Sequence, residues 1–296
     1  MTHDYILSCE STVDLSYSYV SGRNLPVLFY TYVIDGVEYT DDMMRDPEKL
    51  EEFYRLIKEG HLPTTSQINE YRYLEYFTEL LEKGNVLHIA FGSGMTPSVR
   101  NARSAAKQLR EKFPDRKLIV VDSVCASAGY GLFVDDAADM RDNGASMEEI
   151  EEWANKHSNS MHHVFFSTDF TMFKRSGRVS GAAAAMGTLL GICPMMHLDL
   201  EGRIVAFAKV RGRKAAVRGI VNEMLQHAEN GKDYAGKCFI SNSHCMEDAL
   251  ATKEAIESAF PNLAGKVQIS EIGAIIASHC GPGTVAVFFW GDERIA

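Results

Sequence analysis

Short apolar runs alternate with helical patterns through the first half of the chain. Residues 86–91 and 118–121 are apolar at nearly every position, which is typical of strands buried on both faces of a sheet. Between these runs, residues 99–113 carry apolar side chains at spacings of three and four, the period of a helix with one apolar face. Strands that alternate with helices in this way predict an α/β fold built on a parallel sheet.

The other elements of the first half follow from the same patterns and from turn residues. Strands are predicted at residues 5–9 and 26–34, and the Asp35-Gly36 dipeptide predicts a small hairpin with residues 37–39. Gly60 and Pro63 are turn-forming residues that follow the predicted helix at residues 46–59, so we expect a loop there. The predicted loop covers residues 60–68, and the predicted helices cover residues 11–21, 46–59, 69–83 and 127–141.

The pattern changes near residue 158. Asn143-Gly144 breaks the chain, and Ser146 with Glu149 forms a capping box for a helix over residues 147–156. Beyond it, strands and helices no longer alternate regularly, which favours a mixed sheet. We therefore expect an N-terminal parallel-sheet α/β domain at residues 1–158 and a C-terminal mixed-sheet α/β domain at residues 159–296. Strands are predicted at residues 163–167, 195–199, 204–209, 237–241, 267–271 and 284–290, and helices at residues 181–190, 214–229 and 246–260.

Composition agrees with two soluble domains. The chain has 296 residues, of which 46% are hydrophobic and 24% charged, and domains typically hold roughly 100–200 residues. The 30 basic and 40 acidic residues give a net charge of −10, which disfavours nucleic-acid binding. Six cysteines show no C-x-x-C spacing, so we expect reduced thiols, no metal site and no disulfide framework.

The N-terminus and the longest uncharged stretch bear on location. Asp4 follows Met1 closely and no long apolar run comes after it, so a signal peptide is not expected. Residues 179–196 are uncharged but contain three glycines and a proline, and a membrane span requires about 20 mostly apolar residues. We expect no membrane span and a cytoplasmic location.

Two polar loops are candidates for binding an anion. In parallel sheets ligands bind at the carboxyl ends of strands, and residues 92–98, with Ser93 and Thr96, follow one such strand. Free backbone N–H groups at the start of the next helix suit an anion there. The segment equally suits a tight turn, with Thr96 as the helix cap and Pro97 in the first turn. Thr65 and Ser66 are similarly open to a ligand-binding or a helix-capping interpretation.

A histidine and two basic runs are further candidates. His279 precedes a Gly-Pro-Gly sequence and a final apolar strand, and the small neighbours predict an exposed imidazole, although a plain hairpin turn is also possible. Residues 174–178 and 209–214 concentrate cations in an acidic chain. They either form solvated surface or receive phosphate or carboxylate. The chain has no G-x-S-x-G, H-E-x-x-H or G-K-[ST] motif, so machinery for unaided covalent or nucleotide chemistry is not visible.

Five segments, in order along the chain, resemble the DegV family, whose members include the FakB fatty-acid-binding subunits of bacterial fatty acid kinases. They match the family's D-S-T-x-D-L, T-S-Q, strand-ending D-S, G-G-R-I-S and H-x-G-P-G patterns. In this chain they read E-S-T-V-D-L at residues 10–15, T-S-Q at 65–67, D-S at 122–123, S-G-R-V-S at 176–180 and H-C-G-P-G at 279–283.

The chain departs from the family pattern at three places. Glu10 replaces the first aspartate, and residues 92–98 read G-S-G-M-T-P-S where the family has S-S-G-L-S-G-T. Thr96 keeps the hydroxyl of the family's serine, while Pro97 removes a backbone N–H and stiffens the turn. Isoleucine and asparagine follow Gln67 where Pro-Ser is usual.

The resemblance implies two α/β domains that bury a long-chain fatty acid. It implies a carboxylate held near Thr65, Thr96 and His279, with Ser11, Ser66 and Ser93 as further ligand-binding residues in the matching loops. It also implies that a separate ATP-dependent kinase subunit, similar to the dihydroxyacetone kinases, converts the carboxylate to an acyl-phosphate. His279, Arg178 and Arg211 would support that transfer. The protein would then be a substrate-binding subunit, with no cofactor of its own.

Two other functions remain open on the sequence. One is a stand-alone enzyme acting on a small anionic substrate, and the other is a lipid sensor that uses the same pocket without phosphoryl transfer. An apolar tail needs an apolar tunnel, for which flexible methionines are suitable. The candidates for that lining are Met172, Met186, Met195, Met196 and Phe207, although we expect most of them to be ordinary core.

Overall fold

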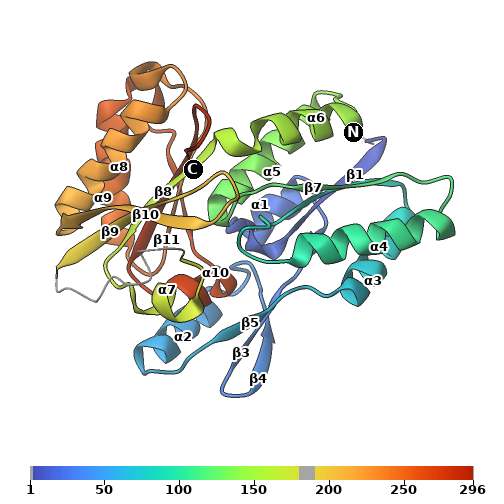
Figure 1. The fold of residues 1–296 in the computed structure, drawn as a ribbon, viewed down its shortest axis with the longest axis horizontal. Helices are drawn as coiled ribbons and strands as arrows, with labels where there is room; N and C mark the ends of the chain where they lie inside the picture. The colour runs from blue at the N-terminus through green and yellow to red at the C-terminus, as the bar shows by residue number, and fades with distance from the viewer. Residues whose placement is uncertain (1–2, 180–190, 296) are drawn as a thin grey trace.

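The computed structural model describes residues 3–179 and 191–295. Its first sheet is parallel throughout and has the order β2-β1-β6-β7 (Figure 1). The prediction of a parallel sheet is confirmed. Its strands are β1 (Tyr5–Glu10), β2 (Val27–Leu28), β6 (Asn85–Ala90) and β7 (Leu118–Asp122).

Helices cover both faces of the parallel sheet. In Figure 1, α3 (Glu70–Leu81) and α4 (Ser98–Lys112) lie on one side, and α5 (Ser127–Asp142) and α6 (Met147–His157) lie on the other. The predicted apolar face of α4 is confirmed, since its apolar side chains are buried. The Ser146–Glu149 capping box at the start of α6 is also confirmed.

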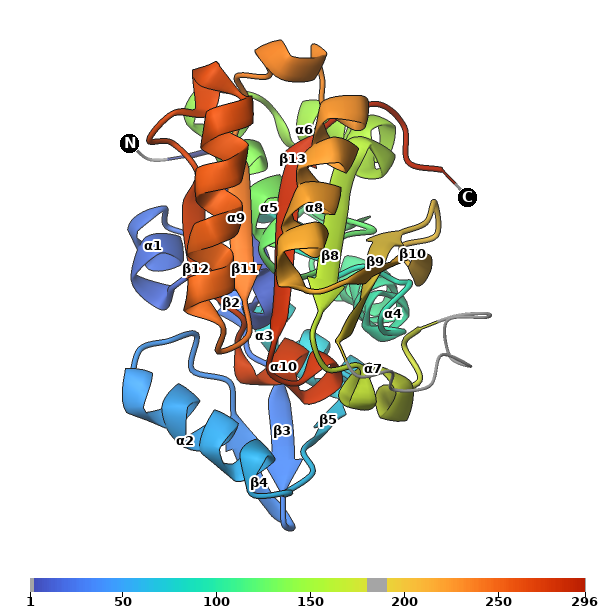
Figure 2. The same ribbon diagram turned by 90° about the vertical axis from the view of Figure 1, so that its left-hand side faces the viewer.

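The second sheet is mixed and has the order β10-β9-β8-β13-β11-β12. Only β11 and β12 run parallel among these described strands; the other neighbours are antiparallel. The strands are β8 (Met161–Ser167), β9 (Ile192–Leu198), β10 (Ile204–Arg211), β11 (Cys238–Asn242), β12 (Gln268–Glu271) and β13 (Thr284–Trp290). Figure 2 shows α8 (Arg213–His227) and α9 (Met246–Ala259) across one face of this sheet.

Helix α5 packs between the two sheets, because it contacts β1 of the first sheet and β8, β11 and β13 of the second. Twelve of its residues are buried, and its aspartates lie in its second half. The described residues form two hydrophobic clusters, and the larger one includes Phe133 of α5 as well as Phe165 and Phe288 of the second sheet. The domain boundary near residue 158 falls in η2 (Ser158–Ser160) and stays a prediction.

A third, small sheet has the order β4-β3-β5 and lies beside α2 (Pro47–Lys58). Strands β3 (Thr31–Ile34) and β4 (Val37–Thr40) form the predicted hairpin. The predicted strand at residues 26–34 is wrong as one element, because β2 and β3 belong to different sheets. The predicted loop at residues 60–68 contains β5 (Thr64–Ser66), which pairs with β3; its polar residues carry no apolar alternation that would reveal a strand.

One helical prediction needs correction, and two helices were not predicted. The helix at residues 11–21 is divided into η1 (Ser11–Val13) and α1 (Tyr17–Gly22). Asp14 breaks it by adopting a left-handed φ of 47°, and its carboxyl accepts hydrogen bonds from Gly273 N and Ser127 Oγ. The sequence patterns missed α7 (Thr171–Ser176) and α10 (Ala274–Cys280). The predicted helix at residues 181–190 lies outside the described residues.

No helix among residues 3–179 and 191–295 is long and apolar enough to span a membrane.

Candidate functional site

A cavity of about 270 Å³ is lined by loops that follow the parallel strands, by the mixed sheet, by the small sheet and by α10. Its walls come from the loops after β6 and β7, from β5, from α7 and α10, and from the inner face of β8 and β13. The loops after β6 and β7 stand at the carboxyl ends of parallel strands, the position expected for a ligand site. Most of the lining is apolar, including Phe91, Phe165, Ile275 and Phe288.

One corner of the cavity is polar. Thr65 of β5 and His279 of α10 meet there, with 2.7 Å between Thr65 Oγ1 and His279 Nε2. Thr96, from the loop before α4, and Arg178, which follows α7, line the same cavity. Figures 1 and 2 both show α7, α10 and β5 as neighbours. Four segments distant in the sequence therefore bring hydroxyls, an imidazole and a guanidinium to one cavity.

His279 is neutral at pH 7. Burial, reinforced by the positive charges of Arg178 and Arg175, lowers the pKa of its imidazole to about 4. Its Nδ1 is buried and has no hydrogen-bond partner among the described residues. An anion in the cavity would raise the pKa of His279 again, because a nearby negative charge stabilises the imidazolium.

The prediction of an exposed His279 in a glycine turn is wrong. The residue occupies the last turn of α10 and is half-buried, and the helix ends at Gly281 with a φ of 67°. A Cβ atom at Gly281 would lie 2.7 Å from Met172 Cγ, so both the backbone and the close packing require glycine here. The Gly-Pro-Gly sequence thus ends the helix that carries the imidazole.

The structure places five of the predicted site residues in the cavity wall: Thr65, Ser66, Thr96, Arg178 and His279.

The other three predicted residues lie outside the cavity lining. Ser11 is buried, and its Oγ accepts a hydrogen bond from the backbone N–H of Tyr30, a lining residue. Ser93 is exposed, and its backbone N–H donates to Asp122 Oδ1. Arg211 is exposed at the end of β10. Ser11 therefore supports the wall, while Ser93 and Arg211 are exposed residues outside the lining.

The loop before α4 contains the tight turn that its sequence allowed, while the anion-binding interpretation stays a prediction. The helix begins at Ser98, one residue later than the cap at Thr96 implied, and Pro97 precedes it. Thr96 Oγ1 still accepts a hydrogen bond from Ser98 N at 3.3 Å, while its side chain lines the cavity. A Cβ atom at Gly94 would lie 2.4 Å from the Glu201 carbonyl oxygen, so this glycine is required for close packing.

The expectation that most of the tunnel candidates are ordinary core is confirmed for the described residues, because Met172, Met195 and Met196 are buried in the hydrophobic core. Phe207 is exposed, and none of the four is in the cavity wall. Met186 lies outside the described residues. Composition alone suggested these residues, whereas strand alternation offers a better signal. Thr284, Ala286 and Phe288 alternate along β13 and share its cavity-facing side.

A buried carboxylate supports the cavity from behind. Glu10 accepts hydrogen bonds from the Tyr30 hydroxyl at 3.2 Å and from Phe91 N at 3.0 Å, and both residues line the cavity. Tyr73 also donates its hydroxyl to Glu10, and His88 Nε2 lies 3.3 Å from the same carboxylate. A fully buried carboxylate requires such donors. The longer side chain at position 10 is therefore accommodated by a complete set of partners.

His163 is a wall residue that the sequence did not single out. Its Nε2 accepts a hydrogen bond from Ala126 N and its Nδ1–H donates to the Met161 carbonyl, both at 3.0 Å. Burial holds the pKa of the imidazole well below its usual value. Both ring nitrogens are thus occupied, and His163 presents a neutral, fixed ring to the cavity.

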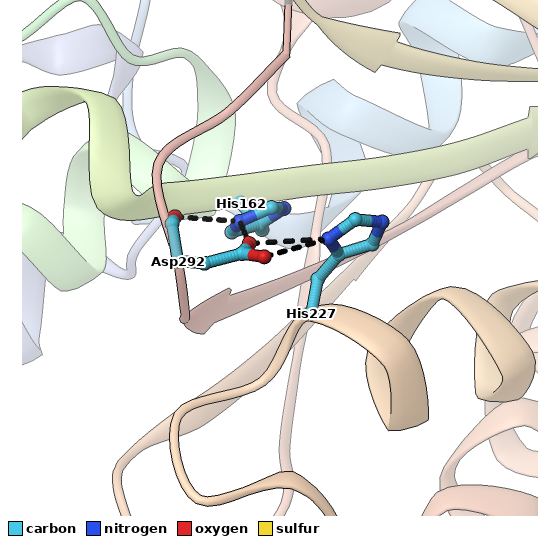
Figure 3. Close-up of side chains that lie close together, drawn as sticks. All are labelled: His162, His227 and Asp292. Carbon is cyan, nitrogen blue, oxygen red and sulfur yellow. Dashed lines mark hydrogen bonds and ion pairs between the residues drawn. The ribbon is translucent and has the colours of Figure 1, made fainter.

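Two clusters of potential metal ligands lie away from the cavity lining. Figure 3 shows His162 and His227 facing the Asp292 carboxylate, with Asp292 Oδ1 3.1 Å from a nitrogen of each ring. The two rings are stacked with an angle of 20° between their planes. A metal ion binds in the plane of an imidazole, so nearly parallel rings disfavour one shared ion. These residues form an imidazole pair around a carboxylate.

The second cluster contains Asp135, Asp136 and Asp139 on α5. The Lys237 ammonium lies 2.5–2.7 Å from all three carboxylates, and Arg23 bonds Asp135 and Asp139 as well. The Lys237 and Arg23 side chains already pair with these carboxylates, so we interpret the cluster as a structural ion-pair network.

Comparison with known proteins finds relatives over nearly the whole chain. The family model described as "Uncharacterised protein, DegV family" matches residues 7–292. The DegV domain-containing protein CPE0026 of Clostridium perfringens is 35% identical over 292 residues, which are 98% of each chain.

Solved structures share the fold. A DegV family protein from Thermus thermophilus, described for its fatty acid binding, has a TM-score of 0.84 and 26% identity, covering 97% of this chain and 99% of its own. DegV from Bacillus subtilis, described as a fatty acid binding protein, has a TM-score of 0.82 and 23% identity, covering 98% of this chain and 100% of its own.

Fold and cavity together define an α/β protein of two large sheets with a mainly apolar cavity that has polar groups in its wall. The chain belongs to the DegV family, as the family match over residues 7–292 and the 35% identical relative establish. The resemblance of its motifs and the predicted α/β fold class are both confirmed.

Proposed function

We propose that this protein binds one long-chain fatty acid in the cavity and presents its carboxylate to a separate ATP-dependent kinase subunit similar to the dihydroxyacetone kinases. The observation that carries the proposal is a mainly apolar cavity whose wall includes the hydrogen-bonded pair Thr65 and His279, together with Thr96 and Arg178. A fatty acid has the same division into an apolar tail and one anionic head. Relatives described as fatty acid binding proteins support the proposal.

The tail dominates the affinity in this proposal. Burying each methylene contributes about 0.8 kcal/mol, whereas one hydrogen bond to a charged group contributes about 1.5–3 kcal/mol. Thr65→Val removes one donor and should weaken binding by about ten- to a hundredfold. A fatty acid would still bind, because the apolar wall is intact.

The transfer step uses the head group. A carboxylate oxygen attacks the γ-phosphorus of ATP, the bond from that phosphorus to the bridging oxygen breaks, and an acyl-phosphate and ADP result. Arg178 at the cavity and the hydroxyl donors keep the carboxylate ionised and stabilise negative charge as it develops. The chain has no G-K-[ST] motif, which fits a division of labour with a kinase.

The test combines purified protein, palmitate, ATP and the dihydroxyacetone-kinase-like protein of the same organism. Acyl-phosphate is trapped with hydroxylamine and measured as the hydroxamate, while displacement of a fluorescent fatty acid measures binding. We expect product only when both proteins and ATP are present.

Matched variants sharpen the result. Ala286→Phe fills the cavity and should abolish both binding and product, while Ser93→Ala, in an exposed residue outside the lining, should leave both unchanged. Binding without any ATP-dependent product would favour the lipid sensor. Failure of the wild-type protein to take up fatty acid would contradict the proposal and leave an enzyme for a small anionic substrate.

A further inference from the structure

Ser98 joins the two loops that reach the polar corner, although it is not in the cavity wall. It is the first residue of α4 and has no exposed surface. Its Oγ accepts a hydrogen bond from Ile68 N at 3.2 Å, just after the Thr65–Gln67 segment, and lies 2.9 Å from Thr96 Oγ1. Asn101, one turn later, donates to the Ile68 carbonyl. The first turn of α4 thus fixes both loops.

The hydrogens on these groups can be counted. The Ile68 N–H occupies one acceptor position of Ser98 Oγ, and the Ser98 N–H donates to Thr96 Oγ1 at 3.3 Å. If the single hydroxyl hydrogen of Ser98 also points to Thr96 Oγ1, then Thr96 is an acceptor twice. A threonine hydroxyl has one hydrogen and two acceptor positions, so its own hydrogen is then free to point into the cavity.

Tyr30 offers a competing acceptor for these hydrogens. Its hydroxyl donates to Glu10 Oε2. Burial raises the pKa of Tyr30, and the Ser98 and Thr96 hydroxyls partly offset that rise. A carboxylate in the cavity is the stronger acceptor for Thr96, because charge-assisted hydrogen bonds are roughly twice as strong as neutral ones.

We propose that Ser98 is a positioning residue that makes Thr96 a donor to an ionised carboxylate. The proposal rests on the fatty acid site proposed above. The relay runs from the Ile68 N–H through the hydroxyls of Ser98 and Thr96 to the ligand, with each hydroxyl donating in the same direction and so polarising the next. It favours an anionic head group over a neutral one that can donate a hydrogen of its own.

A double-mutant cycle tests the relay. Dissociation constants for palmitate and for hexadecanol are measured with the wild type, Ser98→Ala, Thr96→Val and the double variant, after circular dichroism shows that each is folded. Ser98→Ala should weaken palmitate binding about three- to tenfold and leave hexadecanol binding within about twofold. In the Thr96→Val background, the same substitution should change palmitate affinity by less than about twofold.

Other outcomes would overturn the proposal. If Ser98→Ala weakens both ligands equally, Ser98 has only a structural role, and if its effect is the same with or without the Thr96 hydroxyl, the relay is wrong. Ser98→Thr, which keeps the hydroxyl, should restore palmitate affinity, and Ser93→Ala is the control. Should the wild type bind neither ligand, the proposed fatty acid site itself fails, which is distinguishable from failure of the relay.

Discussion

Replacing His279 with glutamine should change how the stability of the protein depends on pH. The unfolded chain protonates His279 near pH 6.5, its ordinary value, whereas the folded protein does so only near pH 4. Between these values the unfolded state binds more protons, so the free energy of unfolding falls as the pH falls. For this one group the loss is about 2 kcal/mol at pH 5 relative to neutral pH. Glutamine keeps a partner for Thr65 and cannot titrate.

Urea unfolding at several pH values provides the assay. The free energy of unfolding of His279→Gln, minus that of the wild type, should rise by about 2 kcal/mol between pH 7.5 and pH 5. Other buried histidines, including His162 and His163, are unchanged and cancel in this difference. Saturating palmitate should shrink the rise, because a bound carboxylate stabilises the imidazolium. A difference that stays constant with pH would refute the buried, neutral state of His279.

Three further predictions concern transfer, the buried carboxylate and α10. Arg178→Ala should slow acyl-phosphate formation, assayed by hydroxamate trapping, by at least about tenfold while fatty acid uptake is retained; unchanged transfer would assign Arg178 to structure. Arg211→Ala should slow transfer only if this exposed residue contacts the kinase, and salt would then screen that contact. Glu10→Ala leaves several buried donors unpaired and should cost about 3 kcal/mol or more in urea unfolding; a loss below 1 kcal/mol would contradict the network. Gly281→Ala should lower stability by about 1–3 kcal/mol, measured in the same way, and no loss would show that the turn after α10 relaxes easily.

Much of the fold is readable from the sequence because its strands are strongly patterned. The apolar runs of β6 and β7 and the spacing along α4 correspond to burial on a parallel sheet, which local sequence records directly. Strand β5 contains only threonine and serine, so its sequence has no apolar pattern. It forms a strand because it pairs with β3. Helix α10 is short and apolar, so its type depends on tertiary contacts with α7 and the small sheet.

The site, like the fold, could be predicted from the sequence only in part. Motif resemblance identified residues that meet at the cavity, such as Thr65, Thr96 and His279, even though they are far apart in the chain. It also selected Ser11, whose hydroxyl instead holds the backbone of Tyr30. The apolar wall and the role of Ser98 depend on which side chains face inward, and that follows only from the packing of several elements.

The central claim, one fatty acid held in this cavity, is tested most directly by native mass spectrometry of the purified protein, followed by organic extraction and lipid analysis. We predict a mass increase that corresponds to one long-chain fatty acid per chain, present in the wild type and in Ser93→Ala and absent from Ala286→Phe. A wild-type protein that carries no fatty acid and takes up none when palmitate is added would contradict the account, as would an Ala286→Phe variant that retains its lipid.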